Sequence, residues 1–308
     1  MAVPAVPGDS RPLVSDSEVE ALFSRYVTET IPRDSARYAE EIERQSQKLA
    51  RASVRVRPSP WLDQGKRAVA HVDAGYSKLW SRLSLDEELS SPKTTWFEWR
   101  DAAMNARTVG RKHLHQLLLI RALDRLAPRS VLEVGFGYGF NLLLLAMQRP
   151  HLSLSGVELT AAGVDAARQL AADSRTRGML APFAVDEVRQ DPAIDASVFC
   201  QGSAEALPLT SKAVDVAFTV LALEQMEQIR EAALRELCRV ARRHVVMIEP
   251  FREWNADGIR RRHIELRHYF DAATCDLPRY GLKPIVASAD FPNKLTFHAG
   301  LVVAEVLT

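Results

Sequence analysis

The stretch VLEVGFGYGFN, residues 131–141, joins an apolar, strand-like run to three glycines spaced two residues apart, Gly135, Gly137 and Gly139. The whole chain has 14 glycines in 308 residues, so three in one turn are a concentrated feature. Glycine adopts positive φ readily and lets a ligand approach the backbone closely. The stretch therefore predicts a strand that ends in a tight, ligand-binding turn.

Six further β-rich runs follow this strand, and helical patterns separate the first five of the seven runs. Strands that alternate with helices favour a parallel sheet covered on both faces. The last two runs lie closer together, so the sheet can end in an antiparallel pair. We expect an α/β fold with a doubly wound, seven-stranded, mostly parallel sheet and an antiparallel strand at its C-terminal end.

The part of the chain that precedes this sheet shows helical periodicity and no strand pattern. Pro32 is expected to end a first helix that begins after Ser15. Further helices are predicted over 34–51, 66–83, 94–106 and 109–126, with a loop at 57–65. We therefore divide the chain into a disordered tail, 1–14, a helical lid or dimerisation region, 15–127, and a ligand-binding domain, 128–308.

The composition excludes several classes of protein. The formal net charge is +1, so no global field attracts nucleic acid or an anionic membrane. The longest aliphatic run, at 142–147, is far too short to span a bilayer. Three widely spaced cysteines form neither a disulfide frame nor a zinc site, which is typical of a reducing compartment. We expect a cytoplasmic protein without a bound metal.

The spacing of the glycines excludes two nucleotide-binding motifs. A dinucleotide site needs G-x-G-x-x-G, but Phe140 or Leu142 occupies the third glycine position, depending on where the count starts. A phosphate-binding P-loop needs a Gly-Lys-Ser/Thr ending, and none follows. The turn must serve a different ligand.

At this point the sequence resembles class I S-adenosylmethionine-dependent methyltransferases. LEVGFGYG is similar to the first motif of that family, with Glu133 two positions before the first glycine. LSLSGVELT (152–160), QGSAEALPL (201–209) and VDVAFTVLALEQM (214–226) then follow in the order of the family's later motifs. The resemblance covers residues 130–308 and implies S-adenosylmethionine as the cofactor.

The resemblance also implies roles for individual residues. The glycine turn would pass under the methionine part of the cofactor, and Glu158 would hold the ribose hydroxyls. Ala204 would bind adenine through its backbone N–H, with Leu159 and Leu207 as walls. The family often has Asp where this chain has Ser203, so that adenine contact departs from the pattern. The implied cofactor-binding residues are Glu133, Gly135, Gly137, Gly139, Glu158, Leu159, Ser203, Ala204 and Leu221.

Catalysis of methyl transfer requires mainly that the nucleophile is aligned and water excluded. In this fold, residues after the fourth strand face the methyl group, so Glu224 is the candidate general base or substrate anchor. Capping of the next helix is an equally good reading of Glu224. The chain lacks the Asn/Asp-Pro-Pro-aromatic motif of adenine and glutamine methyltransferases, and it lacks a carboxylate trio for Mg²⁺.

Other residues are candidates for the acceptor side. Arg260, Arg261, Arg262 or Arg267 can bind an anionic acceptor, although a solvated basic helix explains them as well. His263 and His268 lie in the same segment. Aromatic residues such as Trp80 and those at 96–99 can roof an acceptor or simply dock helices. His113 and His115 are two residues apart on a helix, so they point different ways and form no metal pair.

The leading interpretation is a methyltransferase that acts on a small molecule at O, N or an activated carbon. Its partner would be a small-molecule acceptor, anionic if the arginines above bind it, and the chain can be a homodimer. The alternatives are a protein or RNA methyltransferase, or a non-catalytic assembly factor that keeps the fold. Neutral charge disfavours RNA, and the intact glycine turn with Glu158 disfavours the non-catalytic reading.

Overall fold

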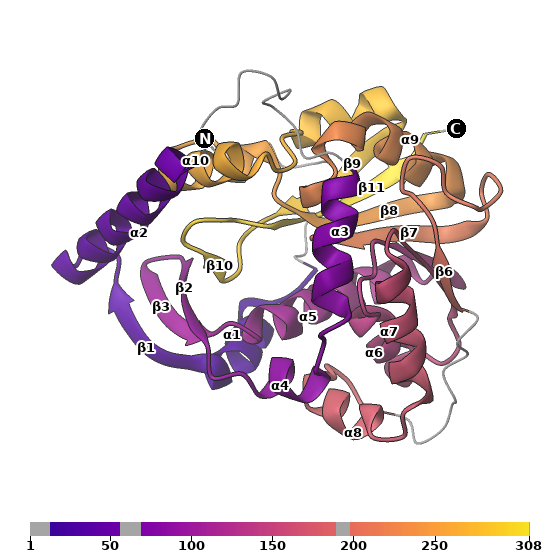
Figure 1. Ribbon diagram of the computed structural model, residues 1–308, viewed down its shortest axis with the longest axis horizontal. Helices are drawn as coiled ribbons and strands as arrows, with labels where there is room; N and C mark the ends of the chain where they lie inside the picture. Colours follow the sequence, from indigo (N-terminus) through magenta and orange to yellow (C-terminus); the bar gives the residue numbers. More distant parts are fainter. Residues whose placement is uncertain (1–12, 56–68, 189–197, 308) are drawn as a thin grey trace.

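Seven strands form one large sheet in the computed structural model, which describes residues 13–55, 69–188 and 198–307 (Figure 1). The strand order is β6-β5-β4-β7-β8-β11-β9; β11 is antiparallel to both its neighbours and the other pairs are parallel. The expected sheet is thus confirmed. Its strands are β4 (Ser130–Val134), β5 (Ser153–Glu158), β6 (Phe199–Gln201), β7 (Val214–Val220), β8 (Ala241–Glu249), β9 (Leu282–Ser288) and β11 (Gly300–Val306).

Helices cover both faces of the large sheet, because successive side chains of each strand point to opposite faces. In β8, Val246 and Ile248 belong to one apolar core, whereas Val245 and Met247 belong to the other. The first core lies under α5 (Gly110–Leu126), α6 (Phe140–Gln148), α7 (Ala161–Ala172) and α8 (Thr176–Leu180), and the second under α9 (Arg230–Val240).

A second sheet of four strands, in the order β1-β3-β2-β10, corrects part of the sequence analysis. The predicted helix at 94–106 is a hairpin, and the last residues before Pro32 form a strand. TTWFEW is aromatic and β-branched, and AAMNAR pairs on both sides, so tertiary pairing overrides its helical propensity. The strands are β1 (Val27–Pro32), β2 (Thr94–Trp99), β3 (Ala102–Arg107) and β10 (Asn293–Lys294).

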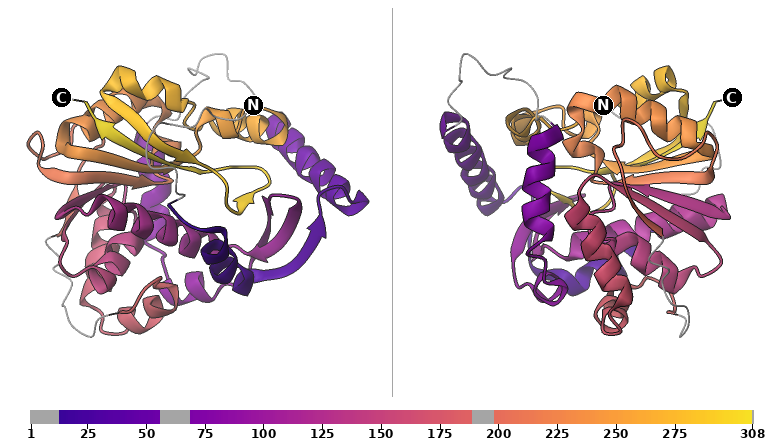
Figure 2. Two further views of the ribbon diagram at one scale, coloured as in Figure 1. Left: turned by 180° about the vertical axis from the view of Figure 1, so that it is seen from behind. Right: turned by 45° about the vertical axis from the view of Figure 1, so that its right-hand side comes forward.

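β10 connects the two sheets, since it lies between β9 and β11 in the chain yet pairs with β2 (Figure 2). The remaining expected helices are present with shifted ends. Leu13 and Val14, expected in the tail, pack against the core, while 1–12 and the loop at 57–65 lie outside the described residues. The remaining helices are α1 (Asp16–Phe23), α2 (Ala36–Arg55), α3 (Val69–Trp80), α4 (Leu85–Ser90) and α10 (Gly258–Arg267).

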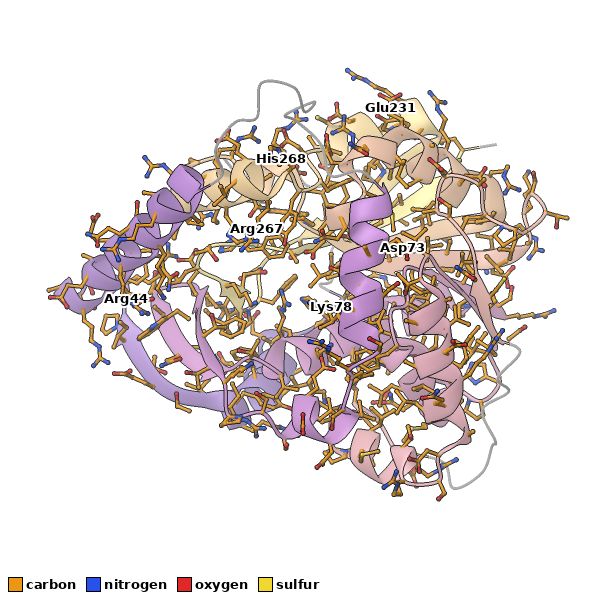
Figure 3. The ribbon with its side chains drawn as sticks, in the orientation of Figure 1. Arg44, Asp73, Lys78, Glu231, Arg267 and His268 are labelled. Atoms are coloured by element: carbon orange, nitrogen blue, oxygen red, sulfur yellow. The ribbon has the colours of Figure 1, made fainter. Side chains whose placement is uncertain are left out.

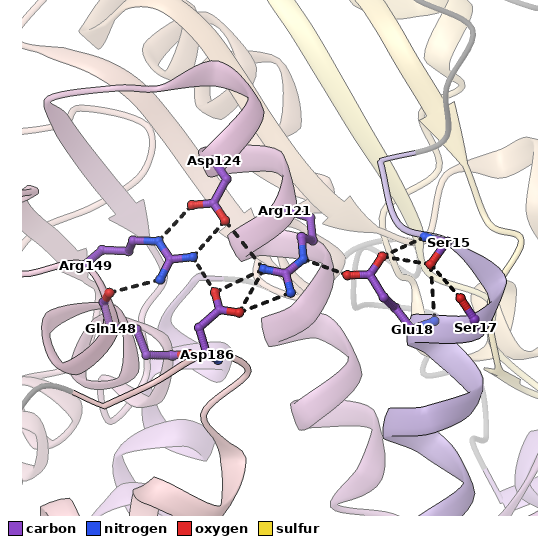
Figure 4. A network of polar contacts seen from close by, with 8 residues as sticks. All are labelled: Ser15, Ser17, Glu18, Arg121, Asp124, Gln148, Arg149 and Asp186. Carbon is purple, nitrogen blue, oxygen red and sulfur yellow. Dashed lines mark hydrogen bonds and ion pairs between the residues drawn. The ribbon is translucent and has the colours of Figure 1, made fainter.

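A network of charges ties the N-terminal helix to the large sheet's helices (Figure 4). Arg121 on α5 donates to Glu18 on α1 at 2.9 Å and to Asp186 at 3.0 Å. Arg149, which follows α6, binds the same Asp186 and also Asp124. The N-terminal elements are therefore fastened to the sheet that carries the glycine turn.

Candidate active site

A cavity of about 280 Å³ lies where β4, β5 and β7 end, at the edge at which open parallel sheets bind ligands. The glycine turn, the ends of these strands and two N-terminal helices line it. The lining residues are Tyr76, Trp80, Arg111, Lys112, His115, Glu133, Val134, Gly135, Phe136, Gly137, Tyr138, Phe140, Asn141, Val157, Glu158, Leu159, Thr160, Gly202, Ser203, Ala204, Val220, Leu221, Ala222, Glu224, Gln225, Met226, Gln228 and Ile229.

The glycine turn needs glycine at each of its three positions. Gly135, Gly137 and Gly139 have φ of 77°, 59° and 84°, which L side chains rarely adopt. A Cβ on Gly135 would lie 2.5 Å from the Cβ of Ala222, and one on Gly137 would lie 3.0 Å from the ring of Trp80. The turn is thus held between the end of β7 and α3, with its backbone facing the cavity.

Glu158 ends β5, and its carboxylate already organises the turn. One oxygen, Oε2, accepts the Gly137 N–H at 3.0 Å. The other, Oε1, accepts both the N–H and the hydroxyl of Thr160, at 3.0 and 2.9 Å. A carboxylate has about four acceptor sites, so roughly one remains for a ribose hydroxyl. Burial raises the pKa of Glu158, and the charge of Asp73 on α3 adds to this (Figure 3).

Glu133 lies at the floor of the cavity with one oxygen unsatisfied. Its Oε1 accepts the Asn141 side-chain amide at 2.7 Å, while Oε2 is buried and has no hydrogen-bond partner among the described residues. Burial, with a smaller contribution from the charge of Glu158, raises the pKa of this carboxyl to about 8. A ligand cation that reached Oε2 would therefore both complete its hydrogen bonding and favour its ionised form.

The implied adenine side is also brought to the cavity. Leu159, Ser203, Ala204 and Leu221 all line it, whereas Leu207 is buried in the second core outside the lining. Leu221 has a φ of 52°, a left-handed conformation that a branched side chain rarely adopts. Such strain at a cavity wall is typical of functional sites.

Glu249 was missed by the sequence analysis and organises the turn that carries Glu224. It ends β8 with no solvent exposure, and its carboxylate accepts the backbone N–H groups of Ala222, Leu223 and Glu224 at 2.9, 3.0 and 3.2 Å. Burial, with the charge of Glu224 second, raises the pKa of Glu249 to about 8. The MIEP run showed a carboxylate at a strand end, but only the fold shows what it binds.

Two helices of the N-terminal region also line the cavity. α3 contributes Tyr76 and Trp80, and α5 contributes Arg111, Lys112 and His115. His113 points away and its Nδ1 lies 2.7 Å from the Tyr26 hydroxyl, so the two histidines diverge as expected. The sequence analysis missed Arg111 and Lys112. The sequence did contain a sign of them: both cations lie in the first turn of a helix, where acidic residues are favoured.

The basic residues proposed for the acceptor do not line the cavity. Arg260 bonds to Glu98, Arg261 to Glu265 and Asp271, and Arg262 to Ser46. Arg267 is exposed at the end of α10 (Figure 3). His263 and His268 of the same segment are also outside the lining. Of the aromatic residues at 96–99, Phe97 packs against Phe23 of α1 and Trp99 donates to Asp290. These two side chains therefore join elements of the fold and do not roof the cavity.

The strands and turns that line most of this site match a known family. Residues 132–248 correspond to the family model described as a methyltransferase domain. Residues 132–248 are therefore similar to a methyltransferase domain, and the large sheet has the fold of class I methyltransferases. The match confirms the resemblance drawn from the glycine turn and S-adenosylmethionine as the cofactor of such a domain. The family model does not specify the acceptor.

Solved structures share the fold of this methyltransferase domain at low identity. The cyclase SpnF is 15% identical over 79% of this chain and 98% of its own, with a TM-score of 0.51. A SAM-dependent methyltransferase from Methanosarcina mazei is 14% identical over 58% of this chain and 92% of its own, with a TM-score of 0.45. Magnesium protoporphyrin IX methyltransferase from Synechocystis, with bound SAM, is 14% identical over 65% of this chain and 85% of its own, with a TM-score of 0.42. No curated protein matches the chain in sequence.

Two further properties bear on function. Within 13–55, 69–188 and 198–307, no three His, Cys, Asp or Glu side chains are grouped so that they could hold a metal ion. Over the same residues, every helix is too short or too polar to cross a bilayer.

Proposed function

We propose that this chain is an S-adenosylmethionine-dependent methyltransferase whose acceptor is a small molecule. The observation that carries the proposal is the lining of the cavity, to which α3 and α5 contribute side chains together with the glycine turn. A bulky polymer would have to displace Trp80, which packs against the turn at Gly137. A small molecule can enter beside the cofactor without that rearrangement.

The residues at the cavity suit the cofactor group by group. The unpaired Oε2 of Glu133 would accept the ammonium of the methionine part, and the free acceptor site of Glu158 would take a ribose hydroxyl. Leu159, Ser203, Ala204 and Leu221 would border adenine. When bound, the cofactor supplies an electrophilic methyl group on a sulfonium.

The chain's own residues would position the acceptor and remove the proton of its attacking group. Glu224 lies beside the cavity on a three-residue turn, Leu223–Gln225, that Glu249 fixes through backbone N–H groups. The short turn gives little helix dipole for Glu224 to complement, which favours the acceptor-side role. A carboxylate there can take the proton of the acceptor's attacking group, while Tyr76 and Trp80 exclude water.

Transfer itself is tested with S-adenosylmethionine that carries a trideuteromethyl group. We expect the label in the low-mass fraction of a cell extract incubated with the protein, and none in the protein or RNA fractions. Label confined to a polymer would contradict the small-molecule acceptor. No label anywhere, with cofactor bound, would favour a non-methylating use of the fold, and the neighbour SpnF is itself a cyclase by name.

Cofactor binding should release a proton through Glu133. Its pKa of about 8 keeps the carboxyl mostly protonated at pH 7 in the empty protein. The cofactor ammonium would lower that pKa, so binding at pH 7 should release about one proton. Calorimetry in buffers of different ionisation enthalpy measures this number.

Two controls isolate that effect. Glu133→Gln keeps the shape of the side chain but cannot ionise, so proton release should vanish in this variant. 5′-Methylthioadenosine lacks the ammonium and should bind without releasing a proton. Equal proton release with both ligands would show that the ammonium is not near Glu133.

A further inference from the structure

Two basic side chains line the cavity, and a third lies close enough for its charge to interact with theirs. Arg111 and Lys112 follow Gly110 at the start of α5 and line the cavity. Lys294 comes from β10, far away in the sequence, and pairs with Phe97 of β2. Its charge interacts with those of both Arg111 and Lys112. β10 and α5 thus bring Lys294 near Arg111 and Lys112, which line the cavity.

Arg111 and Lys294 are held in an environment that disfavours their charges. The charge of Arg111, followed by burial, lowers the pKa of Lys294 to about 7. Burial lowers the pKa of Arg111, and burial with the three cations lowers that of His115 well below its usual value. The N-terminal end of a helix also repels cations. Such an arrangement costs stability unless an anion joins it.

The lack of an ion pair distinguishes Arg111 and Lys294 from other half-buried cations among the described residues. Lys112 has an ion pair with Glu88 at 2.9 Å, and Arg260 has one with Glu98 at 2.6 Å. By contrast, Arg111 and Lys294 make no side-chain hydrogen bond or ion pair within the part of the chain that the structure describes. The acidic group whose charge acts on both is Glu224.

We propose that Arg111 and Lys294 bind an anionic oxyacid group, a carboxylate or a phosphate, on the methyl acceptor. The proposal rests on the proposed function, because it places the acceptor in the same cavity as the cofactor. The guanidinium of Arg111 offers a planar fork of donors that fits either oxyacid, and Lys294 adds a point charge. Held there, the acceptor would extend past Glu224 toward the cofactor.

The test uses the full chain saturated with S-adenosylhomocysteine, whose binding is first measured by calorimetry. Melting temperature is then followed against benzoate and inorganic phosphate, with sodium chloride of equal ionic strength and benzamide as controls. We expect saturable stabilisation by benzoate, by phosphate or by both, and none by benzamide. The response to each anion distinguishes a carboxylate acceptor from a phosphorylated one.

Variants assign that stabilisation to the two cations. In Arg111→Met and Lys294→Met, the apparent anion affinity should fall at least about tenfold, the loss expected for a charged hydrogen bond. Without anion their melting temperatures should hold or rise, because the repulsion between Arg111 and Lys294 is removed. Arg262→Gln, which alters an exposed arginine bonded to Ser46, should behave as wild type.

The outcomes are separable. No anion-specific stabilisation of the wild type, or the same stabilisation in both variants, would overturn the anion site. If Arg111→Met does not fold, Lys294→Met decides. If S-adenosylhomocysteine fails to bind but the anion response is present and lost in the variants, the anion site stands and the proposed function falls.

Discussion

Glu224→Gln is expected to lower the rate of methyl transfer about 10²-fold or more, the usual contribution of a general base. The amide keeps the size and hydrogen-bonding reach of the side chain but cannot take a proton. Cofactor affinity should stay the same, because the glycine turn, Glu133 and Glu158 lie on other strands. Removal of the Glu224 charge ends its repulsion with buried Glu249 and also its attraction to Arg111 and Lys294, so the melting temperature of the variant is measured alongside the rate.

The matched control is Glu231→Gln, the same change on the outer surface of α9, which should leave the rate unchanged (Figure 3). Rates are measured with the acceptor found by labelling. If Glu224→Gln retains full turnover, the acceptor either needs no base or uses another group. His115 is then next, because it lines the same cavity and burial keeps its imidazole neutral at pH 7.

Glu158→Ala is expected to weaken binding of S-adenosylhomocysteine by about 1.5 kcal/mol or more, roughly tenfold or greater. The substitution removes an acceptor for the ribose and also the bonds that fix Gly137 and Thr160. Both losses act in the same direction, because a loose glycine turn must be ordered again when the cofactor binds. Calorimetry measures the affinity.

Asp165→Ala provides the control, since it removes a carboxylate from the exposed face of the neighbouring α7. Glu158→Gln separates the two causes: the amide oxygen can still accept from Thr160, so the turn is better preserved while the charge is lost. Unchanged affinity in Glu158→Ala would mean that the ribose is held elsewhere and that β5 does not correspond to the family's ribose-binding strand.

Local patterns predicted the large sheet because its strands are short, apolar and separated by helices, which leaves few ways to pair them. The N-terminal sheet could not be predicted in this way. AAMNAR has good helical propensity and becomes a strand only because β1 and β2 flank it. β10 has only two residues, and β2 pairs with it.

Within the site, sequence patterns predicted the cofactor-binding residues but not the acceptor-binding ones. Gly135, Glu133 and Glu158 sit at strand ends, where sequence order alone places them at one edge. The acceptor side instead combines Arg111 from α5 with Lys294 from β10, and no local pattern joins them. The sequence analysis chose the basic run at 260–262 because it was visible as a run, but folding pairs those arginines with carboxylates and with Ser46.

The measurement that tests the central claim most directly is a crystal structure with S-adenosylhomocysteine bound. We predict its amino acid part over the turn at 135–139, with the ammonium at Glu133 Oε2 and a ribose hydroxyl on Glu158. Adenine should lie beside Ser203 and Ala204, and the sulfur should face Glu224. Adenosine bound at any other place, or a cavity still empty at saturating ligand, would contradict the account.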